Sequence, residues 1–180
     1  AKEDFALDNL FMWQQDYLRR TADKLVQEDL DKSVFYIKNA EHVYIYAKNA
    51  SRSMAQLLFY RLRRMGIQVS LLPSGGSEIV EGLSHVKKTD LVILFGFSKI
   101  SKEGKLILDY QTSVGYKVLT FTSRNHIPGD EQGDVNLYVY RGESGEYHSM
   151  VAAAAMVDIL VLNLADKMKT DATKQLKKIE

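Results

Sequence analysis

Residues 91–103 read LVILFGFSKISKE. The stretch opens with a fully apolar run, Leu91 to Phe95, which is typical of a strand buried on both faces of a sheet. A loop with two hydroxyl groups, those of Ser98 and Ser101, follows and leads directly into a segment with helical spacing. Backbone N–H groups are unpaired in the first turn of a helix, and the helix dipole favours an anion there. This junction is therefore a place where an α/β protein can hold a phosphate group.

Strand and helix patterns alternate along the chain on both sides of this junction. Short apolar strand patterns occupy residues 43–46, 67–72, 91–95, 117–122 and 135–140. Helical spacing occurs over residues 5–26, 30–39, 54–65, 78–84, 106–114 and 147–168. The alternation predicts a three-layer α/β/α sandwich with a five-stranded, mainly parallel sheet. Ligands bind such sheets at the carboxyl ends of the strands, near the point where the strand order reverses, so the loops after Tyr46 and Phe95 are the best placed.

We expect one domain with an extension at each end. The chain has 180 residues, of which 46% are hydrophobic, and this suffices for one sizeable core. No linker, internal repeat or low-complexity tract divides it. Residues 1–40 are predicted to form a helical extension that packs on the domain, residues 41–168 the domain itself, and residues 169–180 a charged tail.

Composition weighs against several classes of protein. A net charge of +1 gives no reason to expect a nucleic acid or a membrane surface as partner. The chain has no cysteine, which excludes disulfides and thiolate chemistry and fits a reducing compartment. The longest apolar run, Met150 to Leu162, contains Asp158 and is too short to span a membrane. No secretory signal opens the chain, so we expect a cytoplasmic protein without a membrane partner.

The order of elements and two loops resemble a known family. Two helices lead into a strand that is followed by residues 47–51, AKNAS, and a later strand is followed by residues 96–103, GFSKISKE. This arrangement resembles the sugar isomerase (SIS) domain over nearly the whole chain. It is most similar to the C-terminal effector-binding domain of RpiR-type transcriptional regulators, through the two-helix lead-in and the stretch from Tyr147 to Ala165. The resemblance implies a flavodoxin-like or Rossmann-like topology and a homodimer or a dimer of dimers.

The first family loop usually reads glycine–x–glycine–x–serine. Here Ala47 and Asn49 stand at the glycine positions, and Ser51 keeps the serine. Asparagine tolerates a positive φ better than most residues. We therefore expect Asn49 to form the glycine-like turn that this loop requires.

The second family loop usually reads serine–x–serine–glycine–x–threonine, with a glutamate shortly after. Gly96 replaces the first serine, Ser98 keeps the second, and Lys99 replaces the glycine. Ser101 replaces the threonine conservatively, and Glu103 keeps the acid. The side chain of Lys99 has two possible effects, because its ammonium either supplies a counter-charge to phosphate or blocks the pocket.

The resemblance implies a phosphorylated sugar as ligand, with its phosphate hydrogen-bonded by Ser51, Ser98 and Ser101. Asn49 and Lys99 complete the predicted binding residues. The serines also have an ordinary interpretation, because Ser51 and Ser101 lie at helix starts and would serve as N-caps whether or not phosphate binds.

No catalytic residue is predicted for the leading hypothesis. If the protein is an isomerase instead, Glu103 and His148 are the candidate acid and base, since moving a proton between adjacent sugar carbons requires such groups. The ordinary interpretation is that Glu103 complements the helix dipole and that His148 lies on the surface. No pair of histidines has a metal-ligand spacing on one helix face, so we expect neither a metal nor another cofactor.

Three functional hypotheses follow. The first is a non-enzymatic sensor domain of an RpiR-like regulator of sugar metabolism genes. Such regulators carry an N-terminal helix-turn-helix domain, which is not visible in this chain, so contact with DNA is expected only through a domain outside it. The second hypothesis is a phosphosugar aldose–ketose isomerase. The third is a degenerate SIS module that serves dimerisation alone, an idea prompted by Gly96 and Lys99.

Overall fold

The computed structural model describes residues 5–176, with side chains up to residue 170. Its strands are β1 (Val43–Tyr46), β2 (Val69–Leu71), β3 (Leu91–Phe95), β4 (Lys117–Thr122) and β5 (Val135–Tyr138). Its α-helices are α1 (Leu7–Lys24), α2 (Gln27–Asn39), α3 (Arg52–Arg64), α4 (Ser77–Ser84), α5 (Lys102–Val114) and α6 (Val151–Leu176). Two short 3₁₀ turns, η1 (Asn49–Ser51) and η2 (Gly129–Glu131), complete the elements.

The five strands form one parallel sheet in the order β2-β1-β3-β4-β5. The chain leaves β1 toward β2 on one side and returns to place β3 on the other, so the order reverses between β1 and β3. Tyr46 at the end of β1 pairs with Leu94 near the end of β3. The loops after these two strands are therefore neighbours at the switch point, as predicted.

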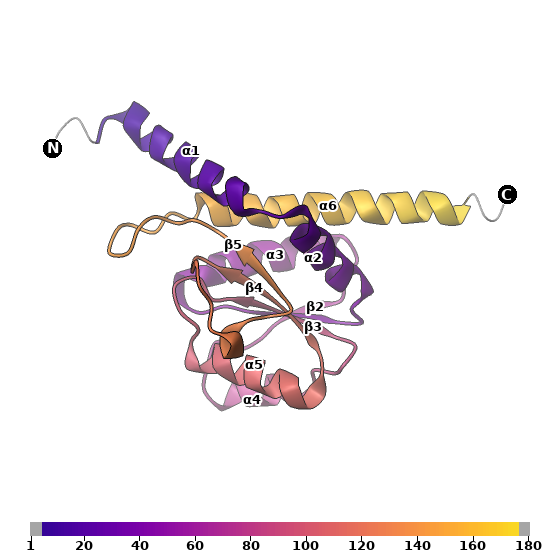
Figure 1. Ribbon diagram of the computed structural model, residues 1–180. Helices are drawn as coiled ribbons and strands as arrows, with labels where there is room; N and C mark the ends of the chain where they lie inside the picture. The colour runs from indigo at the N-terminus through magenta and orange to yellow at the C-terminus, as the bar shows by residue number, and fades with distance from the viewer. Residues whose placement is uncertain (1–4, 177–180) are drawn as a thin grey trace.

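Helices cover both faces of the sheet (Figure 1). Helices α4 and α5 lie on one face, where Ile79 and Ile107 join a core with Val92 and Val118. Helices α2, α3 and α6 lie on the other face, and the core there includes Leu30, Val34, Leu58, Ile93, Phe121 and Leu160. Alternate strand residues thus supply the two cores, and the predicted three-layer α/β/α sandwich is confirmed.

Several predicted boundaries match the structure. The strands predicted over residues 43–46, 91–95 and 117–122 have the same bounds in the structure. Gly115 ends α5 with a left-handed backbone (φ 87°) and its N–H donates to the carbonyl of Gln111. This is the conformation that glycine adopts without steric cost at a helix C-terminus.

The C-terminal part of the chain differs from the prediction. The last helix, predicted over about residues 147–168, begins instead at Val151 and continues to Leu176. Gly142 and Gly145 have φ values of 112° and 88°, which hold the preceding segment as a loop. Other bounds also differ. Strand β2 covers Val69–Leu71 rather than residues 67–72, and β5 ends at Tyr138 rather than Tyr140. Helix α2 begins at Gln27 rather than near Leu30, and α5 begins at Lys102 rather than near Leu106.

The first and last helices, α1 and α6, project from the sandwich in opposite directions (Figure 1). The N-terminal half of α1 extends on one side, above the loop that joins β5 to α6, and the C-terminal half of α6 extends on the other. Residues 1–4 of the predicted N-terminal extension and residues 177–180 of the predicted tail lie outside the described residues. Within residues 5–176, no helix is long and apolar enough to cross a membrane.

Candidate functional site

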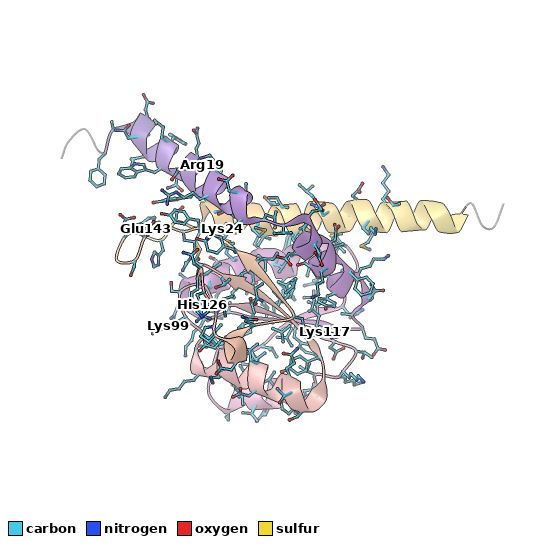
Figure 2. All side chains as sticks on the ribbon, viewed as in Figure 1. Arg19, Lys24, Lys99, Lys117, His126 and Glu143 are labelled. Carbon is cyan, nitrogen blue, oxygen red and sulfur yellow. The ribbon has the colours of Figure 1, made fainter. Side chains whose placement is uncertain are left out.

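The candidate site lies at the carboxyl end of the sheet. Figure 2 shows Lys99 and His126, which follow β3 and β4, on the same side of the molecule as Glu143 in the loop after β5. Lys117, the first residue of β4, lies at the opposite end. The loops after β3, β4 and β5 therefore lie at one edge of the sheet, and Glu143 belongs to the third of them.

The loop after β1 contains the expected left-handed turn. Asn49 has a φ of 54°, and among the described non-glycine residues it alone has a positive φ. Ser51 lies directly before α3 and is partly buried, but its side chain makes no capping hydrogen bond. The hydroxyl of Ser51 is thus not used to cap α3, in contrast to the ordinary interpretation of this residue.

The start of α5 is built around four polar side chains that we call the α5 cap cluster: Tyr46, Lys48, Ser101 and Glu103. The Ser101 hydroxyl accepts a hydrogen bond from the N–H of Gly104 at 3.0 Å, so Ser101 is the N-cap. The hydroxyl of the buried Tyr46 lies 3.1 Å from the Ser101 Oγ and donates to a Glu103 carboxylate oxygen at 3.4 Å. Lys48 Nζ lies 3.0 and 3.1 Å from the two oxygens of Glu103. The predicted residues Ser101 and Glu103 therefore belong to one network.

The charge of Glu103 is stabilised within this cluster. The backbone N–H of its own residue, followed by the ammonium of Lys48, holds the pKa of the Glu103 carboxyl below its usual range. A general base for sugar isomerisation works best with a pKa near the operating pH. A carboxyl would need a raised pKa to reach that range, whereas the surroundings of Glu103 lower its pKa. A lowered pKa is the pattern of a structural ion pair.

A second group of side chains, which we call the Arg141 cluster, consists of Phe97, Ser98, Ser123 and Arg141. Arg141 follows β5 and is only 7% exposed. Its Nη2 donates to the Ser98 Oγ at 3.1 Å and its Nε donates to the Ser123 Oγ at 3.2 Å. Its guanidinium carbon lies 4.1 Å from the centre of the Phe97 ring. The cluster thus joins the loops after β3, β4 and β5.

Sequence reasoning missed Arg141 and Ser123. A signal was present, because both residues follow predicted strands of a parallel sheet, and the carboxyl ends of parallel strands meet at one edge. What the sequence did not reveal is that Arg141 is buried within a polar loop and that its guanidinium contacts the ring of Phe97. Burial lowers the pKa of the Arg141 guanidinium, although arginine keeps its charge in proteins.

Two of the substituted motif positions, Gly96 and Lys99, have distinct explanations. A Cβ at Gly96 would lie 2.5 Å from Cδ1 of Ile100, so the isoleucine side chain fills the space that a serine would need there. Lys99 has no positive φ, and its exposed side chain therefore stands on an ordinary backbone. The replacement of the family glycine by Lys99 carries no backbone strain, because strain of this kind arises only in the left-handed region.

The prediction placed His148 at the start of the last helix, but in the structure that helix begins three residues later, at Val151. His148 is exposed and lies in the loop before Val151, and the structure gives it no hydrogen bond or ion pair with a described residue. Its neighbour Ser149 is buried and donates to the Gln14 side chain of α1 at 2.5 Å. Within the described part of the chain, no group of three or more His, Asp or Glu side chains could hold a metal ion. The expected lack of a metal stays a prediction.

The sequence matches the family model of the SIS domain over residues 36–163. The chain therefore belongs to the SIS domain family. A comparison with curated proteins gave no significant match.

Solved structures of the same fold include transcription factors and enzymes. The sugar isomerase domain of an RpiR transcription factor from Sphaerobacter thermophilus is 23% identical, with a TM-score of 0.82 and 94% of each chain covered. The NanR protein of Vibrio vulnificus, complexed with ManNAc-6P, is 22% identical, with a TM-score of 0.76 over 99% of this chain and 70% of that one. The phosphoheptose isomerase GmhA of Neisseria gonorrhoeae is 12% identical, with a TM-score of 0.68 over 91% of this chain and 97% of that one. At these identities the similarity establishes the fold, which regulators and isomerases share.

Proposed function

We propose that this chain is the phosphosugar-binding sensor domain of an RpiR-family transcriptional regulator, that it is not an enzyme and that it acts in the cytoplasm. The proposed ligand residues are Ser51, Ser98 and Ser101, with Asn49 and Lys99 beside them. The ligand would be a sugar phosphate, the class to which the ligand of NanR belongs. Contact with DNA would come from a helix-turn-helix domain outside this chain.

The single observation that favours a sensor over an isomerase is the ion pair between Lys48 and Glu103. Both oxygens of Glu103 lie within 3.1 Å of Lys48 Nζ, and Tyr46 donates to one of them. A carboxylate held in this way is a poor acceptor for a sugar proton, because its pKa is low and its lone pairs are occupied. The other acid–base candidate, His148, is an exposed loop residue without a described partner to orient it.

Regulation by this domain would follow from unequal binding to two arrangements of a regulator. A ligand shifts an equilibrium only by its difference in affinity for the two states. Binding at the carboxyl end of the sheet would stabilise one arrangement of paired subunits and so change the spacing of the DNA-binding domains.

The test combines binding with turnover. Calorimetry with hexose 6-phosphates, pentose 5-phosphates and amino-sugar 6-phosphates should find one ligand that binds, while the matching aldose–ketose interconversion stays at the level of a Glu103→Gln, His148→Asn double variant. Turnover by the wild type that this double variant lacks would establish the isomerase instead. A stable dimer that binds none of these ligands would favour a module for dimerisation alone.

We further propose that two copies of the chain pair through α1. Leu7, Phe11 and Leu18 fall on one face of the helix and are 68%, 63% and 37% exposed. A groove of about 900 Å³ runs beside this face, between α1 and the loop after β5, and Leu7 and Phe11 line it. Large exposed apolar side chains in such a row mark an interaction surface. In a two-fold symmetric dimer, the row of one copy covers the same row of the other.

Light scattering on the size-separated protein tests this pairing. Phe11→Glu should convert the dimer to a monomer, because the interface cannot bury an unpaired carboxylate. Met12→Glu adds the same charge to an exposed apolar residue of the same helix that does not line the groove, and it should leave the dimer intact. A monomeric wild type, or equal effects of the two changes, would contradict the proposal.

A further inference from the structure

Arg141 carries a positive charge on a buried side chain. Among the residues that the structure describes, no carboxylate forms an ion pair with its guanidinium, although the side chain is buried. Taking a cation out of water costs free energy unless an opposite charge or several hydrogen bonds compensate. The partners of Arg141 are two neutral hydroxyls and the face of an aromatic ring, which compensate only in part.

The hydrogen bonds of Arg141 prepare its two neighbours to bind an anion. Ser98 and Ser123 both use an oxygen lone pair to accept from the guanidinium, so each keeps its own O–H proton for another acceptor. These bonds engage two of the five N–H groups of the guanidinium. Charged donors polarise the hydroxyls that they contact and make them stronger donors.

The location of this cluster is that of a ligand site and not of a buried core. Ser98 is exposed, Ser123 is partly buried, and the loops that carry them follow β3 and β4. The N–H of Ser123 also donates to the carbonyl of Phe97 at 2.8 Å, which fixes the two loops against each other. An anion that reaches the hydroxyl of Ser98 from solvent is thereby brought next to a positive charge held in place by packing.

Two lysines near this edge, Lys48 and Lys99, are less suited to the same task. Lys48 already neutralises Glu103. Lys99 is exposed and would lose side-chain freedom on binding, whereas the guanidinium of Arg141 is held in advance by Phe97 and two hydrogen bonds. Arginine also presents paired donors that match two oxygens of a phosphate, which an ammonium group does not.

We propose that Arg141 binds the phosphate of the ligand together with the hydroxyls of Ser98 and Ser123. The proposal rests on the proposed phosphosugar-binding function and adds the charge that the hydroxyl-rich family motif lacks. The guanidinium makes the site selective for an anionic ligand over the same sugar without its phosphate. The first motif serine is replaced by Gly96, and the side chain of Ile100 occupies the space that this serine would need. Arg141 and Ser123 offset this loss as additional phosphate-binding residues.

Calorimetric titration of the full chain tests the proposal with two probes, inorganic phosphate and N-acetylmannosamine 6-phosphate. Arg141→Gln should weaken the binding of both by roughly tenfold or more, the range for a lost hydrogen bond to a charged group. Arg141→Lys keeps the charge without the paired donors and should bind with intermediate affinity. Lys88→Gln removes the same charge from an exposed residue before β3, at the other end of the sheet, and should stay within about twofold of the wild type.

The outcomes separate this proposal from the function on which it rests. If the wild type binds the sugar phosphate and folded Arg141→Gln binds it equally well, the role of Arg141 is wrong and the sensor function stands. If inorganic phosphate binds in an Arg141-dependent way but no sugar phosphate binds, the anion site stands and the sensor function is wrong. If neither inorganic phosphate nor any sugar phosphate of the panel used for the proposed function binds the wild type, both are wrong. Should Arg141→Gln fail to fold, Ser98→Ala at the exposed end of the cluster provides the test, with an expected weakening of about threefold or more.

Discussion

The α5 cap cluster and the Arg141 cluster lie at the same edge of one sheet, but they differ in whether a charged side chain is paired with one of opposite charge. In the first, the carboxylate of Glu103 meets the ammonium of Lys48 at 3.0 Å, and the hydroxyls of Tyr46 and Ser101 complete the network. In the second, the contacts of a buried guanidinium with described residues are to two hydroxyls and an aromatic ring, without a carboxylate. Paired charges stabilise a fold without inviting a ligand, whereas an unpaired buried charge is satisfied best by a ligand of opposite sign. Changes at Tyr46, Lys48 and Glu103 should therefore affect mainly stability, and changes at Arg141 should affect mainly binding.

The largest effect on stability is expected at Tyr46, whose ring is 1% exposed. Tyr46→Ala should lower the free energy of unfolding by about 3–5 kcal/mol, the cost of removing a large buried ring. Tyr46→Phe keeps the ring and should cost about 1–2 kcal/mol, because the bonds of its hydroxyl to Ser74, Ser101 and Glu103 are lost. Urea unfolding followed by circular dichroism measures both changes.

Tyr44→Phe is the matched control for Tyr46→Phe. Tyr44 belongs to the same strand and is partly buried, but the structure gives its hydroxyl no hydrogen bond. Its stability should change by less than about 0.5 kcal/mol. Equal losses for the two tyrosines would mean that the cap cluster contributes little to the fold.

A smaller effect is expected from the serines at the two helix starts. Ser101→Ala removes the N-cap of α5 and should cost about 1 kcal/mol. Ser51→Ala should cost less than about 0.5 kcal/mol, since its side chain does not cap α3. Thermal and urea unfolding without ligand would show the difference, and a greater loss at Ser51 would reverse our assignment of the two hydroxyls.

The smallest effect should depend on pH and involve Glu103. Its pKa is lowered by its own backbone N–H and by Lys48, so the folded state favours the charged form. The stabilisation is fully present above the pKa of the unfolded chain and is lost as pH falls through the lower folded value. The stability difference between wild type and Glu103→Gln should thus shrink between about pH 5 and about pH 3. Glu78→Gln, an acid exchanged in the first turn of α4, serves as the control, and a difference at Glu103 that stays constant over this range would contradict the prediction.

Much of the fold could be predicted from the sequence because its central strands are uniformly apolar. Runs such as Leu91–Phe95 are buried along their whole length, so their ends are visible as changes in polarity. The start of α6 was harder to predict, because residues after Tyr140 have no apolar period and two left-handed glycines keep them in a loop. Local sequence does not distinguish such a loop from the first turn of a helix.

The candidate site was predictable where it is local and was missed where it is not. Ser98, Ser101 and Glu103 follow β3 directly, so one loop and one helix start identify them. Arg141 is 43 residues away from Ser98 in the sequence, and the two side chains are brought together by the fold. Its proposed role depends on β4 lying next to β3, on β5 lying next to β4 and on the position of the Phe97 ring, which are properties of the folded chain.

The most direct test compares the stability of the wild type and of Arg141→Met with and without inorganic phosphate. Methionine retains an unbranched chain over Phe97 and removes the charge. Without phosphate the two proteins should differ by less than about 1 kcal/mol, because the lost hydrogen bonds are offset by the removal of an unpaired buried charge. With phosphate the wild type alone should gain stability, as expected for a ligand that binds the folded state. An Arg141→Met variant that is strongly destabilised without phosphate, yet gains as much from phosphate as the wild type, would show that Arg141 serves the fold and not the ligand.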